Sequence, residues 1–268
     1  MLNKSEVFDK ELSWIKSDSI RAFATQLTEC APDYFFECAA SSTGKYHPSY
    51  AIGPGGLVRH TKAAAHILHE LLTLEMFNKY TQDQKDMMLA AIIAHDFFKH
   101  GLAAKASQYT VAEHPLVCAN FVKENADLSS MLAPEQIEFI CGCIASHMGQ
   151  WNTDYRSKRE ILPKPQKGPQ NMVHLADYLA SRKYLIFDFE DDYYTPWVAP
   201  AEPENNAELE EAKSQILALC KAKTEAGIAK TTVYKLISEL NGGSRNPNSI
   251  TSMEIATQIL HKLEELNG

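Results

Sequence analysis

Apolar residues recur at helical spacing in five long segments, and this pattern constrains the fold more than any other feature of the chain. Within residues 60–80, one stripe consists of Ala64, Ile67, Leu68, Leu71 and Leu72. A stripe of this kind is typical of an amphipathic helix. The same periodicity runs through residues 84–98, 114–125, 134–147 and 170–186. No segment alternates as a half-buried strand does, so the sequence predicts an all-α fold.

Two local patterns mark where helices of this set begin. Thr81 with Gln84 predicts a capping box, and Pro134 predicts the first turn of another helix. A linker is expected at residues 199–207 (APAEPENNA). The organisation that follows is an N-terminal helical segment with a loop over 1–50, a main helical domain over 51–198 and a small helical unit over 208–268.

The composition is that of a globular protein, with 45% hydrophobic and 22% charged residues in a chain of 268. The net charge of −8 disfavours broad electrostatic binding of duplex nucleic acid. It does not exclude a local basic channel for a short strand. No apolar run approaches the ~18 residues of a membrane span, and no signal peptide is evident. The six scattered cysteines favour reduced thiols over disulfides. A cytoplasmic protein without membrane association is therefore expected.

Histidines and aspartates occur near the ends of five successive predicted helices. The set comprises His60, His95, Asp96, His114, His147 and Asp177. Side chains from facing helices that converge inside a bundle are how helical proteins build metal sites. A mixed His/Asp set without thiolate argues against a structural zinc and suits Mn²⁺, Fe²⁺, Co²⁺, Ni²⁺ or Mg²⁺.

His95 and Asp96 follow the apolar run AAIIA directly. Neighbouring helical residues project about 100° apart, so both can reach one metal only where the helix ends or is distorted. Asp96, with two oxygens, is the natural bridge between two metals. Other histidines are expected to be ordinary core or surface residues, namely His66, His69 and His100. His174 lies three residues before Asp177 and could either face the site or orient a ligand.

Five elements resemble the HD-domain superfamily of metal-dependent phosphohydrolases: GGLVRHT, AHDFFKHG, EHP, SHMG and HLADYLASR. The order H…HD…H…H…D resembles its members with two metals, and is similar to the HD module of bacterial 3′-to-5′ exoribonucleases over about residues 35–190. The resemblance implies a compact bundle of at least five helices and two divalent ions. It implies that His60, His95, Asp96 and Asp177 bind the first metal, and that His114 and His147 bind the second with Asp96 as the bridge.

The chain also departs from those exoribonucleases. They carry an N-terminal OB-type domain that binds nucleic acid, whereas the first 50 residues here do not read as strands. The element AHDFFKHG has Phe97 and Phe98 where family members often carry Ile-Gly.

Several residues are candidates for binding a substrate beside the metals. We expect Asp96 and Lys99 to act in catalysis, with Lys99 neutralising charge on the phosphoryl group, unless it is simply a solvated lysine. Arg182 lies too far round the helix to share a face with Asp177, yet its planar fork suits phosphate at the rim. Lys45, Tyr46 and His47 could line the pocket mouth. The loop after His147 has a basic, aromatic patch that could bind a base and a phosphate, consisting of Trp151, Tyr155, Arg156, Lys158 and Arg159. The alternative is an ordinary surface loop.

The sequence therefore predicts a phosphohydrolase that cleaves a phosphoester of a nucleotide or the 3′ end of a short single-stranded nucleic acid. No side-chain nucleophile motif is present. The C-terminal segment resembles the latter half of a repressor-type helix-turn-helix, with a recognition helix from Thr231 or Thr232, and a packing or dimerisation bundle is the alternative. A ligand-sensing regulator and a structural metal in a homo-oligomer are the competing functions.

Overall fold

The structure is a computed structural model that describes residues 3–41, 47–102, 110–154, 157–189, 192–196 and 206–266. These residues form helices joined by turns and loops, with one isolated bridge between Thr153 and Glu160 and no sheet, so the predicted all-α class is confirmed. The chain divides into two compact units, Met1–Pro196 and Trp197–Gly268, and each has an apolar core of its own. No helix among the described residues is long and apolar enough to span a membrane.

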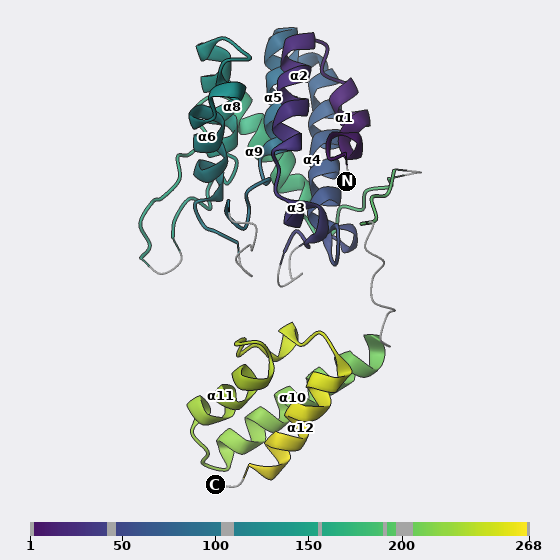
Figure 1. Ribbon diagram of the computed structural model, residues 1–268, viewed down its shortest axis with the longest axis vertical. Coiled ribbons are helices and arrows are strands. Elements are labelled where there is room, and N and C mark those ends of the chain that lie inside the picture. The colour runs from purple at the N-terminus through teal and green to yellow at the C-terminus, as the bar shows by residue number, and fades with distance from the viewer. Residues whose placement is uncertain are drawn as a thin grey trace. The chain divides into compact units, whose positions relative to one another are not determined.

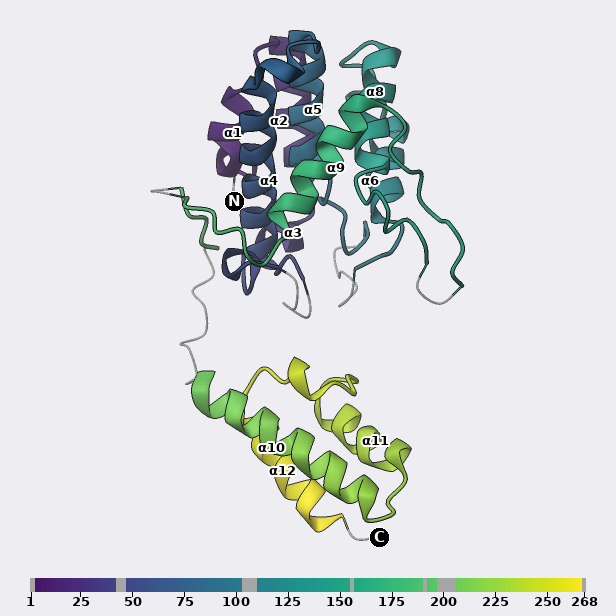
Figure 2. The ribbon, with the colours of Figure 1, turned by 180° about the vertical axis from the view of Figure 1, so that it is seen from behind.

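The larger unit is a bundle of α-helices with short 3₁₀ turns between them (Figures 1 and 2). Its first part holds η1 (Ser5–Phe8), α1 (Asp9–Ser13), α2 (Asp18–Glu29), α3 (Asp33–Glu37) and η2 (Ser49–Ala51). The remainder holds α4 (Gly56–Thr73), η3 (Glu75–Phe77), α5 (Gln82–Ala94), α6 (His114–Glu124), α7 (Ala126–Ser129), α8 (Pro134–Ala145) and α9 (Gly168–Ala180).

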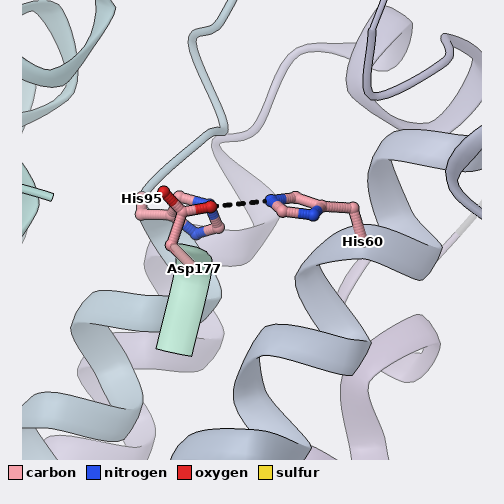
Figure 3. A group of neighbouring side chains, drawn as sticks. All are labelled: His60, His95 and Asp177. Carbon is pink, nitrogen blue, oxygen red and sulfur yellow. Dashed lines mark hydrogen bonds and ion pairs between the residues drawn. The ribbon is translucent and has the colours of Figure 1, made fainter. Parts of the chain in front are cut away.

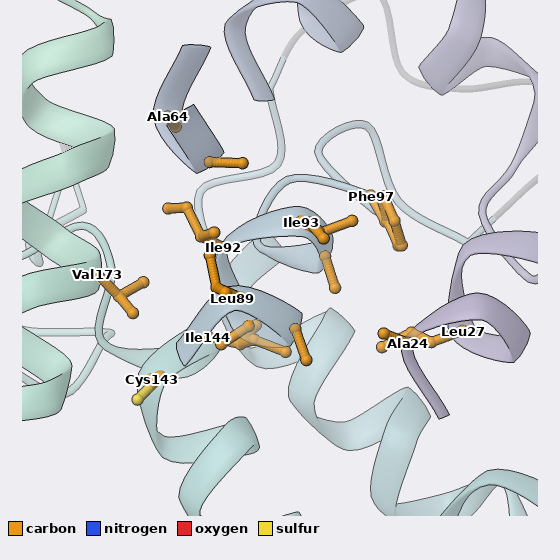
Figure 4. Packing of buried hydrophobic residues seen from close by; sticks show 14 of the residues in the cluster. Ala24, Leu27, Ala64, Leu89, Ile92, Ile93, Phe97, Cys143, Ile144 and Val173 are labelled. Atoms are coloured by element: carbon orange, nitrogen blue, oxygen red, sulfur yellow. The ribbon is translucent and has the colours of Figure 1, made fainter. Parts of the chain in front are cut away.

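Helix α5 is the central element, because it packs against α2, α4, α8 and α9. It begins with the predicted capping box, in which Thr81 accepts from the Gln84 N–H and the Gln84 side chain accepts from the Thr81 N–H. From Asp86 to Ala94 every residue is buried, so this part of the helix has no solvent-facing stripe. Figure 4 shows Leu89 and Ile92 among side chains of the neighbouring helices.

The helix ends bring the predicted ligands together. Helices α4 and α6 begin, and α5, α8 and α9 end, at the same end of the larger unit (Figures 1 and 2). The N-terminal helices support this end directly, since Phe35 lies 4.9 Å and Phe8 6.5 Å, centroid to centroid, from the ring of Phe97, beside Asp96. Phe97 and Phe98 are buried core residues.

Two of the predicted helices end six or more residues earlier than expected. The helix predicted over 60–80 begins at Gly56 and ends at Thr73, where Leu74 turns to an extended conformation. The helix predicted over 170–186 ends at Ala180. The apolar residues beyond it continue the helical pattern, but Phe187 and Phe189 leave the helix and pack their rings on Tyr50. Tertiary packing thereby overrides the local periodicity.

The smaller unit consists of α10 (Asn206–Glu225), α11 (Lys230–Leu240), η4 (Pro247–Ser249) and α12 (Met253–Glu265). All three α-helices pack on one another around buried residues such as Ile216, Val233 and Ile259. The helix expected from Thr231 or Thr232 begins at Lys230, after a four-residue turn in which Gly227 has φ +97°. DNA binding by this unit stays a prediction.

Replacing Ile92 by alanine is expected to destabilise the larger unit strongly. Ile92 is fully buried in α5, so Ile92→Ala should lower the free energy of unfolding by about 2–5 kcal/mol. Met76 is 70% exposed, and Met76→Ala should change that free energy by no more than about 0.5 kcal/mol. Urea unfolding followed by tryptophan fluorescence measures both, and equal losses in the two variants would contradict the central place of α5.

Candidate metal centre

Arg59 fixes the start of α4, one residue before His60. Its side chain is buried, and its guanidinium donates hydrogen bonds to four backbone carbonyls, those of Tyr50 (2.6 Å), Ile52 (3.0 Å), Pro54 (2.9 Å) and Tyr194 (2.6 Å). At Gly56 an added Cβ would lie 2.3 Å from the Ala51 oxygen, so only glycine allows this close approach. Arg59 thereby joins the loop before α4 and the segment 192–196 to the part of α4 that carries His60.

The end of α5 lets His95 and Asp96 face the same interior. The helix ends at Ala94, and residues 95–100 continue as turns. His95 is 0% and Asp96 1% exposed. The predicted condition, that two adjacent ligands need a helix end, is met by this geometry.

Three of the histidines are held in the same way. The Nδ1 atoms of His95, His114 and His147 lie 2.6, 2.8 and 2.8 Å from the carbonyl oxygen three residues earlier in the chain. A carbonyl can only accept, so each Nδ1 carries the proton. In a neutral ring Nε2 then presents a lone pair, which is the arrangement by which second contacts orient a metal-ligating histidine.

Helix α9 presents a row of polar and aromatic side chains at helical spacing. The row consists of His174, Asp177, Tyr178, Ser181 and Arg182, which are separated by three, one, three and one residues. This spacing places them on one face, with the last two in the turn that closes the helix. Asp177 lies 3.0 Å from His60 Nε2 through its Oδ1 (Figure 3). His174 Nδ1 lies 2.6 Å from the His147 carbonyl oxygen, so His174 holds the backbone of a predicted ligand in place.

The two oxygens of Asp96 face two different groups of atoms. Oδ2 lies 3.5 Å from His95 Nε2 and 3.8 Å from His60 Nε2, and Asp177 Oδ1 lies 3.5 Å from the same His95 atom. Oδ1 lies 3.0 Å from His114 Nε2 and 3.7 Å from His147 Nε2. The six residues expected as ligands are therefore neighbours around one carboxylate. His95 lies close to both of its sides, since the ligand atoms of His60, His95 and Asp177 form one group that could hold an ion and those of His95, Asp96 and His147 form another.

The atoms of this cluster fit a cation better than they fit one another. The Nε2 atoms of His114 and His147 lie 3.3 Å apart, yet both are acceptors when both Nδ1 atoms carry the protons. His95 Nε2 and Asp96 Oδ1 are buried without a hydrogen-bond partner in the described part of the chain. Burying these acceptors without a donor is costly, although Asp96 Oδ2 has one in Lys99. A divalent ion beside each oxygen of Asp96 would satisfy them with ligand types that it prefers.

The charges of the site favour binding of a cation. Burial alone would raise the pKa of Asp96, but the positive charges of Lys99 and His95 outweigh it, and its pKa lies well below the usual range. The pKa of Asp177 is lowered in the same way, because its contacts with His60 and His95 outweigh burial. Burial lowers the pKa of His147 to about 3, which keeps its ring neutral. For His95, burial is outweighed by attraction to Asp96 and Asp177, and its pKa is raised. The carboxylates thus favour positive charge at His95 Nε2, where either a proton or a metal can supply it.

A pocket of about 550 Å³ opens onto this cluster. Four of the expected ligands line it, and so do four of the expected substrate-binding residues: His47, Lys99, Trp151 and Arg182. Lys99 is not a solvated lysine, because it is mostly buried and its Nζ lies 2.5 Å from Asp96 Oδ2. Arg182 lines the same pocket as Asp177, so the expectation that it lies too far round the helix is wrong. The helix ends at Ala180, and the side chain returns across Tyr178, with Cζ 4.1 Å from the ring centroid.

Other predicted residues lie outside the pocket or outside the described residues. Lys45, Tyr46, Tyr155 and Arg156 fall in the latter group. His69 stacks on Trp14 and His100 on Tyr34, as expected of ordinary histidines. His66 lies 3.2 Å from Glu11, which Lys62 also contacts. The sequence interpretation missed Met148, Tyr178 and Ser181, which line the pocket. The spacing of Tyr178 and Ser181 from His174 could have indicated the last two.

Comparisons of the chain with protein-family models, with curated proteins and with solved structures found no match. The resemblance to HD-domain phosphohydrolases therefore rests on the five sequence elements. Four of them, GGLVRHT, AHDFFKHG, EHP and SHMG, contribute ligand candidates at helix ends, and HLADYLASR contributes Asp177 from within α9.

Placing a methyl group at Gly149 is expected to disturb the turn that follows His147. Gly149 has φ +59°, and an added Cβ would lie 2.2 Å from the His174 ring. Backbone strain and the clash together should lower the free energy of unfolding of Gly149→Ala by about 3 kcal/mol. Gly53 has φ +71° with nothing near its Cβ position, so Gly53→Ala serves as the matched control and should lose only about 1 kcal/mol. Equal losses would show that the His174 contact does not constrain the turn.

Proposed function

We propose that the chain is a divalent-metal-dependent phosphohydrolase that cleaves a phosphoester of a nucleotide or of the 3′ end of a short single-stranded nucleic acid. The observation that carries the proposal is the convergence of histidine and aspartate ligand atoms on the two oxygens of Asp96. His60, His95 and Asp177 would hold one ion with Oδ2, and His114 and His147 would hold the other with Oδ1. When bound, such a pair of ions lowers the pKa of a water and polarises the phosphoryl oxygen.

The residues of the chain prepare the site for an anionic substrate. The carbonyls of Ile92, Val111 and Ile144 keep three imidazoles in the tautomer that presents Nε2. Lys99 adds a positive charge to the pocket, within reach of a phosphoryl group beside Asp96. Attraction to Asp96 outweighs burial and raises the pKa of Lys99, so its amine stays charged at neutral pH.

An enzyme fits these features better than a structural metal does. Structural metal sites are closed by their ligands, whereas catalytic ones keep access for substrate. Here a pocket reaches four ligand candidates, and a lysine that is not itself a metal ligand lines it. The resemblance to the HD superfamily supports the same reaction class. The narrower features, manganese as the metal and the cytoplasm as the location, are part of this proposal.

Metal content is expected to follow the two proposed sets of ligands. Protein purified without chelator should hold about two divalent ions per chain, Asp96→Ala should hold none, and His147→Ala should hold about one. His69 stacks on Trp14 outside the pocket, so His69→Ala is the matched histidine control and should hold as much metal as the wild type. Elemental analysis gives these numbers, with hydrolysis of bis-p-nitrophenyl phosphate in Mn²⁺ as the activity readout. Metal-free, inert wild-type protein would refute the proposed function.

Removing Lys99 is expected to separate catalysis from metal binding. Lys99→Ala should keep its metal, because lysine is not a ligand, and should lower kcat by about 10²- to 10³-fold. Lys123 forms an exposed ion pair with Glu138 far along α6, and Lys123→Ala should leave kcat unchanged. Steady-state kinetics with metal analysis on the same samples tests both. A Lys99→Ala enzyme with normal kcat would remove Lys99 from the mechanism.

A further inference from the structure

One wall of the pocket is aromatic. The rings of Trp151 and Tyr178 are stacked, with centroids 5.5 Å apart and planes 13° apart. The Arg182 guanidinium lies over Tyr178 at 4.1 Å and is 5.9 Å from the Trp151 centroid. Flat rings with a guanidinium beside them form a surface that attracts another flat, polarisable ring.

The wall is held rigid although its outer ring is exposed. Trp151 is 45% exposed, so part of its ring is accessible to a ligand. Its backbone N–H donates to the Met148 carbonyl at 3.1 Å, in the turn that His174 fixes against Gly149. The Arg182 Nε donates to the Tyr178 carbonyl at 3.1 Å and its Nη2 to Ser181 Oγ at 2.8 Å. A platform built in advance loses little conformational entropy on binding.

The wall borders the anionic end of the pocket. Tyr178 follows Asp177 in α9, so the ring and the expected metal ligand start from adjacent Cα atoms, about 3.8 Å apart. Lys99 and the ligand candidates line the same pocket of about 550 Å³, a volume in the range that takes one small ligand. A substrate with its phosphoester beside Asp96 would therefore carry its next ring system onto this wall.

We infer that Trp151, Tyr178 and Arg182 bind the nucleobase of the substrate, so that the site selects a nucleotide unit over a phosphoester that lacks a base. The inference rests on the proposed function and names its substrate class. Stacking is sequence-tolerant because every base has a π-face. Discrimination among the four bases should therefore be small beside discrimination against the base-free compound.

Binding without turnover tests the inference directly. In chelator, isothermal titration of the full chain should show adenosine binding and no binding of ribose. Trp151→Leu should raise the Kd for adenosine about 10-fold, and Trp151→Phe, which keeps a ring, should raise it less. Tyr184 is 91% exposed and is not part of the pocket lining, so Tyr184→Leu is the matched aromatic control and should leave that Kd unchanged.

Indistinguishable binding of adenosine and ribose would overturn the inference, as would equal effects of Trp151→Leu and Tyr184→Leu. Circular dichroism checks the fold of each variant. Should Trp151→Leu not fold, Arg182→Leu takes its place, with a raised Kd expected and an unchanged one contradicting the inference.

Two further arms of the experiment identify the source of the nucleotide and separate the two proposals. Titration with adenosine monophosphate and with a short oligoadenylate shows whether a free nucleotide or a strand end binds more tightly, and failure of both to bind better than ribose 5-phosphate would overturn the base subsite. If adenosine binds as expected but no phosphoester is hydrolysed with any divalent ion, only the proposed function fails. If bis-p-nitrophenyl phosphate is hydrolysed but adenosine does not bind, only the base subsite fails.

Discussion

The carboxylate of Asp96 is the charge on which the arrangement of the larger unit depends. It is 1% exposed, and an ionised carboxylate left unpaired in such surroundings would cost several kcal/mol. Lys99 contacts one of its oxygens, and imidazoles from four different helices surround both. The helices therefore meet at their ends, since only there can His95 and Asp96 face inward together. The same concentration of acceptors makes the cluster suited to divalent ions.

Precise placement of this cluster requires a rigid scaffold, and the N-terminal part of the chain supplies some of it. Phe8 and Phe35 pack on Phe97, immediately after Asp96. Buried Arg59 joins the start of α4 to the segment 192–196, and Asp192 of that segment contacts Lys62 at 3.0 Å. The first helices therefore belong to the core of the unit that holds the site.

The sequence predicted the helical class and the cluster of histidines and aspartates because both follow local rules. Apolar periodicity marks α5, and the order of histidines and aspartates at helix ends marks the cluster before any contact is known. Contacts between distant residues could not be read in this way. Phe187 and Phe189 pack on Tyr50 after α9 has ended. Because the helix ends before Arg182, the Arg182 side chain can lie over the Tyr178 ring. The four carbonyls that hold Arg59 likewise come together only in the fold.

The most direct test of the account is the number and position of metal ions bound at Asp96. Crystals of the full chain grown with Mn²⁺ would give anomalous difference peaks at the manganese edge. The account predicts two peaks about 3.5–4 Å apart, one beside Oδ2 with His60, His95 and Asp177 and one beside Oδ1 with His114 and His147. A well-ordered site without a peak, or a single peak that does not contact Asp96, would contradict the two-metal centre.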